Sequence, residues 1–97
     1  MGKLDGKVAI VTGGGTGIGK GIARAFAAEG ARVVIASRSE RTLNDAAVEL
    51  GGQVIAVPTD LKEEAEVVSL FQRTLAEMGQ LDILVNNSGV FEGGPLD

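Results

Sequence analysis

A glycine-rich stretch, Thr12-Gly13-Gly14-Gly15-Thr16-Gly17-Ile18-Gly19, decides the fold that we predict for this chain. It follows a short β-branched run at residues 7–12, which is typical of a strand. After it, from residue 17 to about residue 30, apolar side chains recur at the spacing of one helix face: Ile18, Ile22, Ala25 and Phe26. The stretch therefore joins a strand to a helix, and we interpret it as the first crossover of an α/β fold.

The same alternation continues along the chain. We predict further strands at 31–36, 53–57 and 81–86, and further helices at about 39–50 and 62–78. The strands are nearly continuous apolar runs, which is typical of a parallel sheet buried on both faces. We therefore predict a doubly wound, Rossmann-type sheet with strand order 3-2-1-4. Residues 1–97 would form a partial dinucleotide-binding domain, truncated where a further helix is expected after the loop at 89–97.

Composition excludes several other classes of protein. The chain has 97 residues, enough for one domain at most. It contains no cysteine and no histidine, so neither a disulfide framework nor a typical zinc site is expected, and we predict no metal. Its net charge is −4 and its nine cationic residues are scattered, which argues against nucleic-acid binding. No apolar run approaches the roughly 20 residues that span a bilayer, so we expect a cytoplasmic protein without a membrane partner.

The glycines fit a nucleotide-binding loop of one particular spacing. The pattern G-x-G-x-x-G fails in every register, whereas G-x-x-x-G-x-G fits at Gly13, Gly17 and Gly19. A phosphate-binding P-loop is excluded because Gly21 stands where that loop needs Ser or Thr after Lys20. A glycine-rich connection can also be only a turn. The strand before it and the helix after it favour a loop that holds a diphosphate at the helix N-terminus.

Two motifs together resemble the short-chain dehydrogenase/reductase family. They are Thr12-Gly13-x-x-x-Gly17-Ile18-Gly19 and, after the fourth predicted strand, Asn86-Asn87-Ser88-Gly89. The resemblance extends from Leu4 to the last residue, although the family usually has Ala where Ser88 stands. It implies that a nicotinamide dinucleotide is bound by residues in four segments: Thr12, Gly13, Thr16, Gly17, Ile18 and Gly19; Ser37 and Arg38; Asp60 and Leu61; and Asn87, Ser88 and Gly89.

The end of the second predicted strand favours NADP over NAD. By the resemblance, Ser37 occupies the position where an acidic residue would bind the ribose hydroxyls of NAD. The adjacent Arg38 suits the 2′-phosphate of NADP, and Arg41 adds charge. These residues also have a purely structural interpretation. Ser37 with Glu40 matches a capping box, Ser39 is a second candidate cap, and exposed arginines are common.

Asp60 also has two interpretations. The resemblance implies that Asp60 contacts the adenine ring of the cofactor, with Leu61 beside it. Asp60-x-x-Glu63 equally matches a capping box for the third predicted helix. One aspartate has enough acceptor sites for both roles.

The catalytic residues that the family implies are not found in these 97 residues. The resemblance implies a Ser and a Tyr-x-x-x-Lys segment, and the chain has no tyrosine. We therefore expect an NADP(H)-dependent enzyme that interconverts a small-molecule carbonyl and alcohol by hydride transfer, with the 97-residue chain alone inactive. A homo-oligomer is possible. The alternative is a non-catalytic nucleotide-binding or interaction module.

Overall fold

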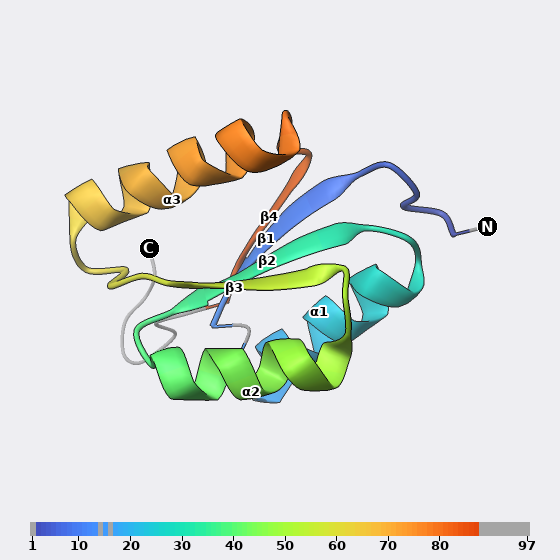
Figure 1. Cartoon of the computed structure of the whole chain (residues 1–97), viewed down its shortest axis with the longest axis horizontal. Helices are drawn as coiled ribbons and strands as arrows, with labels where there is room; N and C mark the ends of the chain where they lie inside the picture. Colours follow the sequence, from blue (N-terminus) through green and yellow to red (C-terminus); the bar gives the residue numbers. More distant parts are fainter. Residues whose placement is uncertain (1, 14, 16, 88–97) are drawn as a thin grey trace.

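Four parallel strands form one sheet in the order β3-β2-β1-β4, as predicted. The computed structural model describes residues 2–13, 15 and 17–87. Its elements follow in the order β1 (Val8–Thr12), α1 (Gly17–Ala28), β2 (Arg32–Ser37), α2 (Glu40–Leu50), β3 (Val54–Pro58), α3 (Glu64–Met78) and β4 (Ile83–Asn86). Helices α1 and α2 cover one face of the sheet and α3 covers the other, which confirms the doubly wound class (Figure 1).

The register of the sheet brings the carboxyl ends of its strands to one edge. Thr12, the last residue of β1, pairs with Ala36 in β2 and with Asn86 in β4. Ser37 at the end of β2 pairs with Pro58 at the end of β3. In open parallel sheets, ligands bind outside this edge, where the strand order reverses. Here the reversal lies between β1 and β4, directly beside the glycine-rich stretch.

Two apolar cores hold the helices to the sheet. The core beneath α1 and α2 is formed by Val11, Ala23, Ala31, Val33, Ile35, Leu43, Ala46 and Val54. The core beneath α3 is formed by Val8, Ile10, Val34, Ala36, Val57, Leu70 and Met78. Every residue of β1 is buried, as a central strand covered on both faces requires. Within the described part of the chain, no helix is both long and apolar enough to cross a membrane.

Strand β4 differs from the prediction of continuous burial. Its residues alternate between half-buried and exposed, and the side chain of Leu84 is 49% exposed. The reason lies in the path of α3, whose buried residues pack on β1, β2 and β3. In the described residues, β4 therefore forms a sheet edge with one apolar side chain uncovered.

The helix starts decide between the candidate caps. Helix α2 begins at Glu40 as predicted, and Ser39 is confirmed as its N-cap, with the Ser39 side chain accepting a hydrogen bond from Thr42 N. The capping box of Ser37 with Glu40 is therefore wrong. Helix α3 begins at Glu64 rather than near Lys62, and its N-cap Glu63 makes no side-chain capping bond.

The turn before α3 explains its late start. Glu63 N donates to the carbonyl of Asp60 at 2.9 Å, and Lys62 N donates to Asp60 Oδ1 at 3.0 Å. Asp60 thus closes its own turn two residues on, so the capping box of Asp60 with Glu63 is wrong. Glu66, one helical turn later, instead accepts a hydrogen bond from Asp60 N at 2.7 Å.

Candidate nucleotide-binding site

The glycine loop leaves β1 through a left-handed turn. Gly13 has φ +70° and its N–H donates to the carbonyl of Ala36 at 2.7 Å, so the chain turns away while it stays attached to β2. Gly17, the first residue of α1, has φ +57°. Side chains other than glycine rarely adopt this region without a steric cost of about 1–2 kcal/mol. Both positions therefore require glycine for conformational reasons.

Gly19 is required for a different reason, which is space. A Cβ atom at Gly19 would lie 2.1 Å from the carbonyl oxygen of Gly13 and 2.7 Å from Asn87 Nδ2. At Gly17, by contrast, a Cβ would meet no atom within 4 Å among the described residues. The backbone is therefore packed tightly at Gly19, whereas the described residues leave free space beside Gly17. Because the first amides of a helix have no intrahelical partner, this open N-terminus is suited to an anion.

Thr12 and Asn87 connect the glycine loop to β4. Thr12 is buried, and its hydroxyl oxygen accepts a hydrogen bond from Asn87 N at 2.8 Å and lies 3.2 Å from the acceptors Val85 O and Asn86 Oδ1. The Asn87 side-chain amide lies against Gly13 and Gly19. The two motifs separated by about seventy residues thus meet at one edge of the sheet. Thr16, Ser88 and Gly89, the other predicted contacts of these motifs, lie outside the described residues.

Ser37 and Arg38 lie at the end of the neighbouring strand. Ser37 is half-buried, and its carbonyl accepts a hydrogen bond from Thr59 N at 2.7 Å, so β3 holds this strand end in place. Arg38 and Arg41 are exposed and take no part in the ion pairs formed among the described residues. Ser37 and Arg38 therefore lie at the same edge of the sheet as the glycine loop, and Arg41 follows in the first turn of α2.

Leu61 reaches the same edge from the side of α3. It lines an open pocket of about 290 Å³ together with Thr12, Val67, Leu70, Phe71, Leu84 and Asn86. Five of its seven lining residues are apolar, and Thr12 and Asn86 carry its polar side chains. Asp60 is half-buried immediately before Leu61, in the turn that precedes α3.

Ile18 belongs to the open part of the site and not to the core. Its helical spacing placed it with Ile22 and Phe26 on one apolar face, but its side chain is 75% exposed. Ile22 and Phe26 pack against the core beneath α1 and α2, and Ile18 does not. An exposed isoleucine next to an open glycine fits a position that a ligand would cover.

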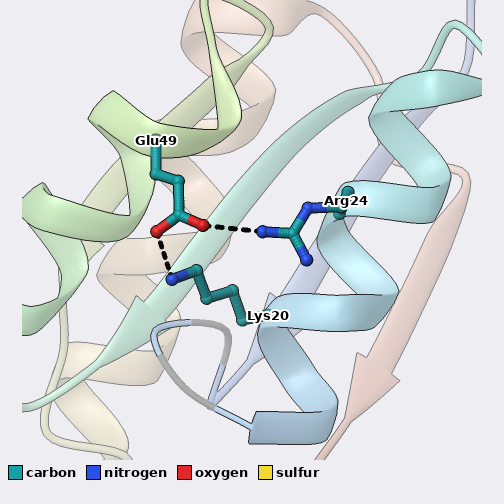
Figure 2. A network of polar contacts seen from close by, with 3 residues as sticks. All are labelled: Lys20, Arg24 and Glu49. Carbon is teal, nitrogen blue, oxygen red and sulfur yellow. Dashed lines mark hydrogen bonds and ion pairs between the residues drawn. The ribbon is translucent and has the colours of Figure 1, made fainter.

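Lys20, the cationic residue closest to the glycine loop in sequence, already forms an ion pair. Lys20 follows Gly19, and its ammonium group pairs with Glu49 of α2, to which Arg24 also donates at 2.7 Å (Figure 2). The hydrogen bond from Lys20, followed by the charges of Lys20 and Arg24, lowers the pKa of Glu49 even though partial desolvation opposes it. The three side chains are partly exposed, so their main effect is to orient α2 on α1 and not to add much stability.

One neighbour of the glycine loop, Thr42, could not be predicted from the sequence. A Cβ atom at Gly15 would lie 3.0 Å from the Cγ2 methyl of Thr42, in the first turn of α2. Thr42 belongs to no motif, and only the packing of α2 beside the loop brings it there. Across residues 2–13, 15 and 17–87, no three side chains of the types His, Cys, Asp and Glu gather where they could hold a metal ion.

Comparison with known proteins decides the family. A model of the short chain dehydrogenase family matches residues 7–97. The chain belongs to this family. An uncharacterized oxidoreductase of Methylorubrum extorquens is 46% identical over 96 residues, covering 95% of this chain and 39% of that protein. The resemblance carried by the two motifs is thereby confirmed.

Solved structures of short-chain dehydrogenases have the same arrangement. A short chain dehydrogenase from Bacillus anthracis is 38% identical with a TM-score of 0.85, covering 89% of this chain and 36% of that one. The 3-ketoacyl-(acyl-carrier-protein) reductase from Brucella melitensis, solved in complex with NADH, is 41% identical with a TM-score of 0.81, covering 84% and 34%. The chain thus spans between 34% and 39% of the length of these relatives.

Proposed function

We propose that the complete protein is an NADP(H)-dependent oxidoreductase that interconverts a small-molecule carbonyl and an alcohol, and that residues 1–97 are part of its dinucleotide-binding domain. The observation that carries this proposal is the left-handed glycine at the start of α1, together with the part-buried hydrogen bond between Asn87 and Thr12 at the same sheet edge. Family membership supports a nicotinamide cofactor and a small-molecule substrate. A cytoplasmic location and a homo-oligomeric assembly are further parts of the proposal.

The residues of the site fit the diphosphate of a dinucleotide. Gly17 has no side chain, and the described residues leave the place where one would begin free within 4 Å, which supports room for a diphosphate at the start of α1. The positive end of the helix dipole favours the bound negative charge. Thr16, Ile18, Gly19, Asn87, Ser88 and Gly89 would complete the contacts to the diphosphate and the nicotinamide ribose, and Asp60 and Leu61 those to the adenine.

The end of β2 supports NADP as the preferred cofactor. The exposed guanidinium of Arg38 and the hydroxyl of Ser37 would meet a 2′-phosphate, and no carboxylate takes the place of Ser37. Against this stands the reductase of Brucella melitensis, which was solved with NADH. The local charge at residues 37–41 is the feature of this chain that favours the phosphorylated cofactor.

The bound nicotinamide would supply or accept the hydride. The residues of this chain would bind and orient the cofactor, because the sequence has no tyrosine to serve as the catalytic acid that the family implies. We accordingly propose that these 97 residues bind a dinucleotide without turnover by themselves. The alternative, a non-catalytic binding module, predicts that the complete protein also binds NADPH but reduces no carbonyl compound.

A matched pair of glycine variants tests the proposal. Gly17→Ala places a methyl group in front of the α1 amides and should weaken NADPH binding by about tenfold or more, which corresponds to about 1.4 kcal/mol. Gly79→Ala is the control, because Gly79 also has a positive φ (+78°) and no neighbour within 4 Å, but it ends α3. Both variants should lose a similar amount of thermal stability.

Binding is measured by fluorescence titration of NADPH and NADH with the complete protein. Normal affinity in Gly79→Ala together with weak affinity in Gly17→Ala supports the proposal. A wild-type protein that binds neither nucleotide, or a Gly17→Ala variant with full affinity, contradicts it. Oxidation of NADPH in the presence of a panel of ketones and aldehydes then distinguishes the enzyme from the binding module.

A further inference from the structure

In the described part of the chain, the side chain of Thr42 lies between Gly15 of the glycine loop and the N-cap of its own helix. On the loop side, its Cγ2 methyl lies 3.0 Å from the place where a Cβ on Gly15 would be, while the nearest atoms of Leu43 lie 3.5 Å and 3.6 Å away. Gly15 is buried. The Thr42 methyl therefore limits the space at Gly15 more closely than any other neighbour.

On the other side, the Thr42 hydroxyl is tied to Ser39. Ser39 Oγ donates to Thr42 Oγ1 at 2.9 Å, and Thr42 N donates back to Ser39 Oγ at 3.4 Å. Ser39 is the N-cap of α2 and directly follows Arg38. The conformation of the segment that carries Ser37 and Arg38 is thus linked through Ser39 to the same side chain that supports the loop.

The far end of α2 is fixed as well. Glu49, near the C-terminus of α2, is held between Lys20 and Arg24 of α1 (Figure 2). Leu43 and Ala46 of the same helix are also buried in the core beneath α1 and α2. Because α2 is packed in this way, we expect a change at Thr42 to shift the glycine loop or residues 37–39.

We infer that Thr42 is a positioning residue that holds the glycine loop and residues 37–39 at the separation required by one dinucleotide. This inference rests on the proposed function, in which the loop binds the diphosphate and residues 37–39 bind the 2′-phosphate. Both groups belong to one ligand, so the two segments must keep a fixed relative position. The methyl of Thr42 would affect binding of both cofactors, and its hydroxyl would affect selectivity between them.

The contact between the Thr42 methyl and Gly15 can be tested with a double variant. A methyl group is added at Gly15, and the space that it needs is restored by removing Cγ2 from Thr42. Gly15→Ala should weaken the binding of both NADPH and NADH by about tenfold, because the new methyl would lie 3.0 Å from Thr42 Cγ2, closer than carbon atoms usually pack, and would push the loop away from α2. Thr42→Ser removes Cγ2 and keeps the hydroxyl, so alone it should weaken both cofactors equally, by about two- to threefold. The double variant Gly15→Ala/Thr42→Ser should regain affinity to within about threefold of wild type, since the two sites are coupled.

The hydrogen bond between Ser39 and Thr42 is tested by a substitution that removes the Thr42 hydroxyl and keeps its methyl group. Thr42→Val keeps a methyl beside Gly15 but removes the acceptor for Ser39 Oγ. It should weaken NADPH binding by about three- to tenfold, the effect of one net hydrogen bond, and leave NADH binding within about twofold. A residue that only stabilised α2 would not change the ratio of the two affinities.

Fluorescence titrations of both cofactors on the complete protein, with a melting curve for each variant, give all the required values. Rescue of affinity in the double variant and a selective loss of NADPH affinity in Thr42→Val are the results expected. The inference is overturned if the double variant binds as weakly as Gly15→Ala, if only its melting temperature recovers, or if Thr42→Val weakens both cofactors equally. A wild-type protein that binds neither cofactor would overturn the proposed function itself, and the inference with it.

Discussion

The two ends of the sheet differ in how the chain surrounds them: side chains close the amino end, whereas the carboxyl end carries an exposed side chain. At the amino end, a side chain from before β4 closes the start of β1: Val8 N donates to Asp82 Oδ2 at 2.9 Å, and Asp82 N donates to the carbonyl of Val8 at 2.9 Å. Gln80 adds bonds to the carbonyl of Gly6 and to Asp82. At the carboxyl end, the space beside Gly17 is open and Ile18 is exposed.

This difference separates residues that serve stability from residues that serve a ligand. Backbone polar groups need partners wherever they are removed from water. At the amino end the chain provides those partners from Asp82 and Gln80, so nothing further is needed there. At the carboxyl end the first amides of α1 have no partner within their own helix, as at the start of any helix, and an anionic ligand can satisfy them. Substitutions at the two ends should therefore affect different measurements.

The largest effect is expected for Gly19→Ala. The added Cβ would lie 2.1 Å from the carbonyl oxygen of Gly13, which is backbone and cannot move aside cheaply. We expect a loss of about 3 kcal/mol in the free energy of unfolding, at the upper end of the usual cost of overpacking, together with loss of cofactor binding. Chemical denaturation and nucleotide titration measure the two effects.

Gly21→Ala is the control for this prediction. Gly21 lies two residues further along the same helix, and a Cβ there would meet nothing within 4 Å. Alanine is the better helix former by about 1 kcal/mol, so this variant should be as stable as wild type or more stable. Equal behaviour of the two variants would show that the approach of Gly19 to Gly13 is not a real constraint.

A smaller and more selective effect is expected for Ser37→Asp. The new carboxylate would repel a 2′-phosphate and accept hydrogen bonds from the ribose hydroxyls of NAD, so the ratio of NADPH to NADH affinity should fall by about tenfold or more. The control, Ser69→Asp, adds the same charge to the exposed surface of α3. An unchanged ratio in Ser37→Asp would refute the assignment of this position, while stability should change little in either variant.

Most of the fold could be predicted because its signals are local. The β-branched run before the glycines, the apolar strands and the glycine pattern each occupy a few neighbouring residues, and together they determine the class and the strand order. Thr12 meets Asn87 because both lie at the carboxyl ends of adjacent strands, a consequence of the strand order.

What could not be predicted depends on packing between distant segments. Asp60 was assigned a capping box with Glu63, but the chain turns once more before α3 begins, and Glu66 reaches the backbone instead. Ile18 fits a helical apolar face by its spacing, yet its side chain is exposed, because burial depends on what packs beside the first turn of α1. The position of Thr42 beside Gly15 likewise follows only from how α2 packs on the sheet.

The smallest effect belongs to the amino end and should appear in stability alone. The hydrogen bond from Val8 N–H, and then that from Gln80, lowers the pKa of Asp82 in the folded protein. The folded state therefore binds this proton less tightly than the unfolded chain. The resulting stabilisation is present in full above the ordinary pKa of an aspartate and disappears as the pH falls through the lowered value.

Asp82→Asn removes the charge and keeps the size of the side chain. At neutral pH its melting temperature should lie slightly below that of wild type, and the gap should close as the pH falls into the range in which Asp82 itself becomes protonated. Asp45→Asn, at an exposed position on α2, is the control for the loss of one surface charge. Affinity for NADPH at neutral pH should be unchanged in both variants. A difference in melting temperature that does not depend on pH would show that the shape of Asp82 matters and its charge does not. A loss of NADPH affinity would mean that the two ends of the sheet are not independent.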